Sequence, residues 1–243
     1  MIDYVNNNIR KAPLHRMFSA VPRRYDLVNH VVTWGLDKRW RWQLAKECLD
    51  NEPKKLLDLC SGTGDLVINM AQLADNSSEL TALDYAEPML TVASRKASKI
   101  LKNSKIKFVH GEAGELPFPD GYFDCVGISF AFRNLTYKNP LAQQHIAEVL
   151  RVLQPGGRFV IAETSQPESG LIRKLFHLYL RQYVFRVGNF ISGNRGAYSY
   201  LAESATRFYT ADELKKILIN AGFRHISIRP FLLGAVAIHT AIK

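Results

Sequence analysis

Two glycines stand between an apolar, strand-like segment and a helical pattern. The segment Leu56-Leu57-Asp58-Leu59-Cys60 leads directly into Ser61-Gly62-Thr63-Gly64-Asp65. Glycine lets the backbone approach a ligand closely, and the free N–H groups of a helix N-terminus favour an anionic group. We therefore expect Asp58, Gly62, Thr63 and Gly64 to bind a small-molecule cofactor. The alternative is a tight strand-to-helix turn without a ligand.

A carboxylate follows at the end of the next apolar segment. Asp84 closes Thr81-Ala82-Leu83-Asp84-Tyr85, about 20 residues after the glycine turn, where an acid can accept hydrogen bonds from two ribose hydroxyls. Alone, Asp84 could equally cap a helix that begins at Glu87-Pro88. Sites for NAD or FAD need a third glycine. Val67 holds that position here, which argues against a dinucleotide.

Two further segments carry polar groups at matching places. Glu112 and Ala113 follow the third strand candidate, and an acid in that loop can hydrogen-bond an adenine amino group. A solvated acidic turn is the alternative. Ser129 ends Phe123-Asp124-Cys125-Val126-Gly127-Ile128-Ser129, the fourth strand candidate. Because the carboxyl ends of parallel strands form one crevice, we expect these groups to meet there.

The elements that must position these residues alternate along the chain. Strand candidates lie at 55–60, 80–84, 106–110, 123–129 and 158–163, with helical patterns at about 64–74, 86–101 and 138–152. The alternation predicts an α/β fold whose parallel sheet has helices on both faces. A Gln154-Pro155-Gly156-Gly157 turn precedes the fifth strand.

Residues after the fifth strand have a different character. Residues 171–187 place apolar side chains on one side of a helix and Arg173, Lys174, His177 and Arg181 on the other. A Gly-, Ser- and Asn-rich stretch, 188–200, follows. Thr210 is then expected to cap a helix to Asn220, before an antiparallel hairpin with strands at about 224–230 and 235–242.

The composition is that of a globular protein with a basic surface. The 243 residues are 47% hydrophobic and 22% charged, with a formal net charge of +10. Excess positive charge attracts nucleic acid, acidic lipids or anionic small molecules, although it can also serve solubility alone. The three cysteines lack the paired spacing of a zinc site, and we expect no metal. No apolar run approaches the ~18 residues of a membrane span, and no signal peptide is expected.

These motifs together resemble the class I S-adenosylmethionine (SAM) methyltransferases, and more closely the quinone-biosynthesis C-methyltransferases. The closer resemblance rests on 25–29 with Trp34-Gly35, the glycine turn, 116–120, 128–134, 198–204 and Ala221-Gly222-Phe223. It runs from about residue 16 to the C-terminus. It implies a Rossmann-like, seven-stranded sheet with N-terminal helices and a helical insertion before a C-terminal hairpin.

That resemblance implies one methyltransferase domain over residues 1–243. Its parts would be an N-terminal helical segment (14–49), a cofactor-binding core (50–165), a helical insertion facing substrate and membrane (166–205), and a C-terminal helix with hairpin (206–243). Thr63, Asp84, Glu112, Ala113 and Ser129 fall where the family contacts SAM. Many relatives have Asp or Asn in place of Glu112. The implied reaction is C-methylation of a polyprenylated quinol, most simply demethylmenaquinol to menaquinol.

Such a reaction needs an electron-rich ring carbon aligned with the methyl group and assisted loss of a ring hydroxyl proton. Arg133 and Asn134, just beyond the fourth strand candidate, are placed to meet the acceptor ring. Because arginine stays protonated, Arg133 would stabilise a developing phenolate or position a water. Tyr25, Tyr200 and His239 are further candidates for proton transfer; a structural hydrogen bond is the alternative for each.

The isoprenoid tail requires an apolar channel. The apolar side of 171–187 and the aromatic residues of the N-terminal segment could supply it, although a helix that covers the sheet explains the same periodicity. The basic residues would suit an anionic membrane surface, so we expect a cytoplasmic protein that associates peripherally with the inner face of the membrane. Self-association into a homo-oligomer is left open.

Three other functions are consistent with parts of the sequence. A nucleic-acid methyltransferase fits the charge, but Ile128-Ser129-Phe130-Ala131 stands where amino-directed base methyltransferases carry Asn/Asp-Pro-Pro-aromatic, and we expect no nucleic-acid partner. A methyltransferase for another lipid or small aromatic remains an alternative. So does a SAM-binding subunit that serves as a scaffold for quinone-biosynthesis proteins.

Overall fold

A computed structural model describes residues 22–75, 77–101 and 106–243, and the side chains from Asp26 onward. Its sheet has the strand order β3-β2-β1-β4-β5-β7-β6. Strands β1 (Lys55–Leu59), β2 (Glu79–Asp84), β3 (Ile106–His110), β4 (Phe123–Ser129) and β5 (Leu153–Thr164) pair in parallel. Strand β7 (Val236–Ile242) pairs antiparallel with both β5 and β6 (Arg224–Phe231). The predicted α/β class and the closing hairpin are confirmed.

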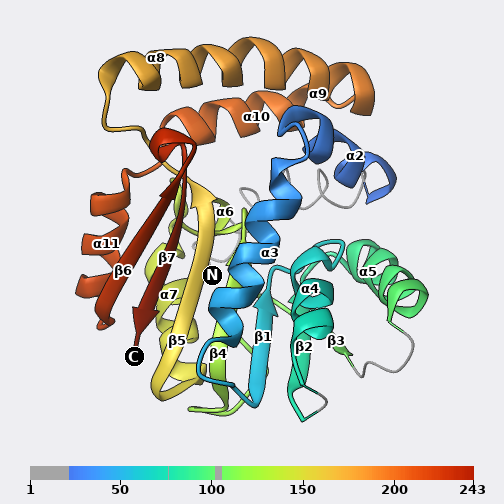
Figure 1. Ribbon diagram of the computed structural model, residues 1–243, viewed down its shortest axis with the longest axis vertical. Helices are drawn as coiled ribbons and strands as arrows, with labels where there is room; N and C mark the ends of the chain where they lie inside the picture. Colours follow the sequence, from blue (N-terminus) through green and yellow to red (C-terminus); the bar gives the residue numbers. More distant parts are fainter. Residues whose placement is uncertain (1–21, 76, 102–105) are drawn as a thin grey trace, which may run out of the picture.

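Helices cover both faces of the sheet (Figure 1). On one face, α3 (Leu36–Leu49), α4 (Asp65–Leu73) and α5 (Glu87–Ile100) bury their apolar sides. On the other lie α6 (Phe132–Thr136), α7 (Ala142–Val152) and α11 (Ala211–Asn220). Alternate strand residues serve the two cores: in β5, Phe159 and Ile161 face one and Val160 and Ala162 the other. The strand periodicity thus fixes both layers.

A third layer lies across the carboxyl ends of the parallel strands (Figure 1). It consists of α8 (Gly170–Tyr179), a π-helical turn η1 (Leu180–Val184), α9 (Phe185–Ser192) and α10 (Arg195–Thr206), with α2 (Pro22–Val32) against them. Its own apolar cluster includes Val28, Leu180, Val184 and Tyr198. This layer closes the end of the sheet where the sequence predicts the site.

Several predicted boundaries were wrong. Strand β5 begins at Leu153, not at residue 158: the Pro-Gly-Gly segment lies inside it, as an irregularity in its pairing with β4. Helix α7 begins at Ala142, and α6 is an element that the sequence analysis did not predict. The helix predicted over 171–187 continues through η1 and α9 to Ser192, and most of the Gly-, Ser- and Asn-rich stretch is helical.

Packing explains why this stretch is helical. A Cβ atom on Gly188 would lie 2.2 Å from the ring of Tyr198, so only glycine lets α10 approach α9 this closely. Asn194 caps α10 by accepting a hydrogen bond from the Ala197 amide at 3.1 Å. Farther on, Thr210 caps α11 in a full capping box with Glu213, as the sequence predicts.

Candidate active site

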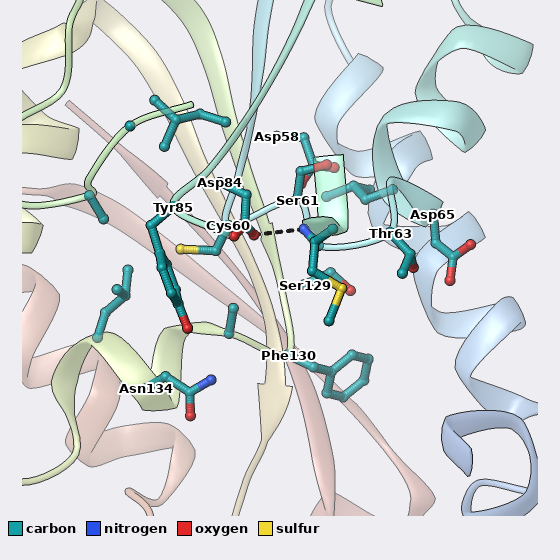
Figure 2. A pocket seen from close by; sticks show the side chains of 18 of the residues that line it. Asp58, Cys60, Ser61, Thr63, Asp65, Asp84, Tyr85, Ser129, Phe130 and Asn134 are labelled. Carbon is teal, nitrogen blue, oxygen red and sulfur yellow. Dashed lines mark hydrogen bonds between the residues drawn. The ribbon is translucent and has the colours of Figure 1, made fainter. Parts of the chain in front are cut away.

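A cavity of about 140 Å³ opens at the carboxyl ends of β1 and β4, where the strand order reverses (Figure 2). Ligands of open α/β sheets bind at such switch points. All but one of the predicted cofactor residues line it: Asp58, Gly62, Thr63, Asp84, Glu112, Ala113 and Ser129. The exception is Gly64, which is the N-cap of α4. The four segments singled out in the sequence therefore meet in one place.

The glycine turn is held open by backbone geometry. Gly62 and Gly64 have φ angles of +55° and +81°, which favour glycine. A Cβ atom on Gly64 would lie 2.8 Å from the Cβ of Ala93 in α5, whereas a Cβ on Gly62 would meet nothing within 4 Å. Gly64 thus permits the helices to pack closely, while Gly62 leaves space on the cavity side.

Asp84 is fixed by backbone amides from the glycine turn and from the start of α5. Its Oδ2 accepts a hydrogen bond from the Gly62 amide at 2.8 Å, drawn in Figure 2, and its Oδ1 accepts one from the Ala86 amide at 2.8 Å. Burial raises the pKa of this carboxyl group, and the amides oppose that shift. The N-cap of α5 is Ala86, so the interpretation of Asp84 as a cap is wrong.

Asp58 lies deeper, beneath the turn. Its side chain accepts a hydrogen bond from the Val67 amide at 3.0 Å and so joins β1 to α4. Burial raises its pKa to about 7, with smaller effects from nearby groups that include Asp84. Asp58 therefore supports the turn from within as well as lining the cavity.

The cavity wall contains polar side-chain atoms that are ready for a ligand. Among the residues that the structure describes, Ser129 Oγ and Asn134 Oδ1 are buried without a hydrogen-bond partner. Such groups are costly unless something satisfies them. Together with the glycine turn and the Asp84 carboxylate, they form a donor and acceptor set that fits a polar, nucleoside-like cofactor. Glu112 lies at the exposed edge of the cavity and Ala113 is buried in its wall.

The N-terminal helices close this site through charges that the sequence analysis did not single out. Thr63 donates a hydrogen bond from its hydroxyl to Asp26 of α2 at 2.6 Å. Lys96 of α5 forms ion pairs with Asp26, at 2.8 Å, and with Asp65. Arg41 of α3 lies 3.4 Å from Asp65. Their signal was weak, because charged residues on helices usually face solvent.

A second, larger cavity of about 500 Å³ adjoins the first. The two cavities share Arg41, Phe130 and Asn134 in their walls. Most of its remaining lining is apolar or aromatic and comes from the third layer, the α2–α3 turn and α3: Val32, Trp34, Trp40, Ile172, Leu175, Phe176, Tyr179, Leu180, Val184, Ala197, Tyr198, Tyr200 and Leu201. The helix at 171–187 therefore lines an apolar cavity. Of the two interpretations of its periodicity, this agrees with the channel and not with a helix that only covers the sheet.

Arg133 lines the second cavity, but protein groups already bind it. Its Nη1 donates to Glu163 Oε1 at 2.7 Å and to Thr164 Oγ1 at 3.0 Å, and its Nε donates to Ser204 at 3.0 Å. Both members of the Arg133–Glu163 pair are buried. These protein groups fix the guanidinium in the cavity wall, and its action on a substrate stays a prediction.

The other candidates for binding or proton transfer do not all lie at the cavities. Asn134 and Tyr200 line the second cavity, and burial raises the pKa of the Tyr200 phenol. His239 is buried in β7, beyond the lining of both cavities, with Nε2 3.3 Å from the Ala211 carbonyl oxygen. Burial lowers its pKa to about 4. The structure does not support a catalytic role for His239. Tyr25 lies in α2, but its side chain is outside the described part of the structure.

A model of the ubiE/COQ5 methyltransferase family matches residues 6–243. The chain belongs to this family. It is 41% identical to a demethylmenaquinone methyltransferase of Thermus thermophilus over 92% of its own length and 98% of the relative. It is 39% identical to a second enzyme of that name, from Deinococcus radiodurans, over 87% and 85% of the two chains. The resemblance found in the sequence is thereby confirmed.

Solved structures give the same fold. A SAM-dependent methyltransferase from Aquifex aeolicus superimposes with a TM-score of 0.54 at 19% identity, over 78% of this chain and 81% of that one. The Rossmann-like, seven-stranded methyltransferase sheet is therefore confirmed.

Two features are absent from the part of the chain that the structure describes. Within 22–75, 77–101 and 106–243, no group of three or more His, Cys, Asp or Glu side chains could hold a metal ion. None of the helices in those ranges combines the length and apolar character needed to cross a membrane.

Proposed function

We propose that this methyltransferase transfers a methyl group from SAM to a ring carbon of demethylmenaquinol, giving menaquinol. The observation that carries the proposal is the junction of its two cavities: a polar one, suited to a nucleoside, shares Arg41, Phe130 and Asn134 with a larger apolar one. A lipid-tailed aromatic acceptor needs such a pair. The family and the names of the two relatives support the same reaction.

The cofactor would lie along the first cavity. A carboxylate has about four acceptor positions, and the amides of Gly62, Tyr85 and Ala86 use three of those on Asp84. One acceptor position thus remains for a ribose hydroxyl. Glu112 and Ala113 would meet the adenine, while Thr63, Ser129 and the glycine turn hold the rest. When bound, SAM supplies an electrophilic methyl group through its sulfonium.

The acceptor ring would lie at the junction. Asn134 Oδ1, buried and without a hydrogen-bond partner in the described structure, is placed to accept a hydrogen bond from a ring hydroxyl and so orient the ring. Because burial raises its pKa, Tyr200 stays a neutral donor at pH 7. Arg133 would act on the ring from its fixed position in the wall. The apolar lining keeps water from the reacting carbon.

Peripheral association with an anionic membrane is part of the proposal. The net charge of +10 supports it, because polybasic surfaces gain about 1 kcal/mol per Lys or Arg near acidic lipid headgroups. Flotation with neutral and with anionic vesicles tests this. Equal binding to both would remove the electrostatic part.

The reaction is tested with methyl-labelled SAM and a short-tailed demethylmenaquinol under reducing conditions, alongside a demethylated methoxybenzoquinol. We expect label on the ring carbon of the first, and none with Asp84→Ala. Transfer to the benzoquinol alone would replace the naphthoquinol in the proposal. No transfer to either, although calorimetry shows SAM binding, would remove the quinol and return the search to other lipids or to a scaffold role.

A further inference from the structure

Helix α8 has apolar side chains that the rest of the described protein leaves exposed. Its sequence has an amphipathic period, yet none of its residues is fully buried. Leu171, Leu175 and Leu178 lie on one side and are 69%, 57% and 56% exposed. In Figure 1, α8 lies at the outer edge of the molecule, above the sheet. A helix that only covered a core would turn these leucines inward.

The tip of the last hairpin has the same character. Leu232 and Leu233 are 50% and 75% exposed and have φ angles of +47° and +55°, a conformation that leucine rarely adopts. The tip lies beside the start of α8, because a Cβ on Gly234 would be 3.4 Å from Pro167 Cα. The backbone therefore presents two adjacent leucines outward in a conformation that is unfavourable for them.

Part of this exposed apolar surface belongs to the wall of the second cavity. Leu175, Leu232 and Trp34 line that cavity, and all three are largely exposed. Trp34 stacks on Tyr183 of η1, with ring centroids 5.8 Å apart, so the α2–α3 turn meets the helical layer there. We call Trp34, Leu171, Leu175, Leu178, Leu232 and Leu233 the apolar rim.

Charge indicates what covers this rim. Residues 169–202 contain five Lys or Arg and no Asp or Glu. Of the five, Lys174, Arg181, Arg186 and Arg195 are exposed. Basic residues next to exposed leucines match a lipid bilayer, whose acidic headgroups lie above an apolar interior. A second copy of this chain would bring the same positive charge and repel.

We propose that the apolar rim inserts into the lipid bilayer, and that the acceptor enters the second cavity directly from the membrane. This proposal rests on the proposed function in one respect, the lipid tail of the acceptor. The rim seals the cavity opening against the bilayer, so the tail stays in an apolar environment throughout. The basic residues of the layer hold the protein on the surface while the leucines enter it.

The test uses three rim residues that do not line the cavity. The triple variant Leu171→Gln, Leu178→Gln, Leu233→Asn keeps good helix formers in α8 and places a residue that tolerates a positive φ at the tip. Its matched control is Ile100→Gln with Ile219→Gln, two exposed apolar residues outside the rim. Binding is measured to vesicles of phosphatidylcholine and phosphatidylglycerol, and turnover with a tail-less soluble quinol and with a long-tailed quinol held in the vesicles.

We expect the triple variant to lose about a hundredfold in vesicle affinity, from the apolar area of three leucines, and the control to lose none. Turnover of the soluble quinol should stay within about twofold of wild type, while turnover of the vesicle-held quinol falls. Wild-type vesicle affinity or wild-type turnover of the vesicle-held quinol in the triple variant would overturn the proposal. So would light scattering that shows a lipid-free wild-type dimer and a monomeric triple variant. A third outcome separates this proposal from the proposed function. If the triple variant loses vesicle binding as expected but even wild type turns over no quinol, the proposed function is overturned and the docking surface is retained.

Discussion

Replacing Glu163 by glutamine tests the buried contact that holds the wall of the second cavity. Glu163 Oε1 accepts hydrogen bonds from Arg133 Nη1 at 2.7 Å and from the Thr164 amide at 2.8 Å, and its Oε2 accepts one from the Arg133 amide at 3.0 Å. Both oxygens therefore face donors. In either orientation, the side-chain NH₂ of glutamine would point at one of them.

The magnitude follows from burial. The Arg133 and Glu163 side chains are 4% and 1% exposed, so the substitution leaves an uncompensated charge away from water. Breaking a buried pair from one side costs about 3–5 kcal/mol. A folded domain is stable by only about 5–15 kcal/mol. We therefore expect Glu163→Gln to remove a large part of the unfolding free energy.

The assay is urea denaturation followed by tryptophan fluorescence and circular dichroism. Glu203→Gln is the matched control, because Glu203 pairs with Lys138 and Arg207 at the surface, where each pair is worth about 0–1 kcal/mol. Replacing both Arg133 and Glu163 by leucine removes the unpaired charge but leaves the Arg133 and Thr164 amides without their acceptor, so it should restore only part of the lost stability. A Glu163→Gln protein within about 1 kcal/mol of wild type would refute the reasoning.

Three further substitutions have expected effects that the structure sets. Gly64→Ala should lower the unfolding free energy by about 1–3 kcal/mol in urea denaturation and weaken SAM binding in calorimetry. The reason is that the new methyl group would lie 2.8 Å from Ala93 Cβ, at a backbone φ of +81°. Unchanged stability and SAM affinity would contradict this. Leu233→Asn should raise the unfolding free energy by about 1 kcal/mol, since asparagine tolerates its φ of +55°, and a lower midpoint in thermal denaturation would count against the strain. Burial lowers the pKa of His239 to about 4 in the folded state, so the unfolded chain takes up its proton first and stability falls as the pH drops from about 6.5 to 4. Wild type should lose up to about 3 kcal/mol more than His239→Gln over this range in denaturation curves, and parallel losses would remove the assignment.

The cofactor half of the molecule could be predicted because its signals are local. Strand periodicity placed β4 at Phe123–Ser129 with both boundaries correct, and the acid at the end of β2 falls in the cavity as expected. In each case, the residue type, its neighbours and the strand end carry the information together. The sheet topology then brings these residues together, since parallel strands place their carboxyl ends at one edge.

The acceptor half could not be predicted, because packing between separate elements decides it. Gly188 is typical of a break, yet α9 contains it and depends on it, since the Tyr198 ring occupies the space of a side chain. Arg133 has the charge and place of a substrate ligand, but its partner Glu163 lies 30 residues away. A single sequence shows neither contact.

Backbone strain is concentrated around the two cavities. Nine described residues other than glycine have a positive φ, and four of them line a cavity: Cys60, Phe130, Trp34 and Leu232. Cys60 and Phe130 follow β1 and β4, the strands beside the switch point. Each such residue costs about 1–3 kcal/mol, and such costs persist mainly where function requires the geometry. At the hairpin tip, the same reasoning predicts effects of opposite sign: Leu233→Asn should stabilise the free protein and, within the triple variant, weaken its hold on a bilayer. A fold selected for stability alone would not keep leucine at that position.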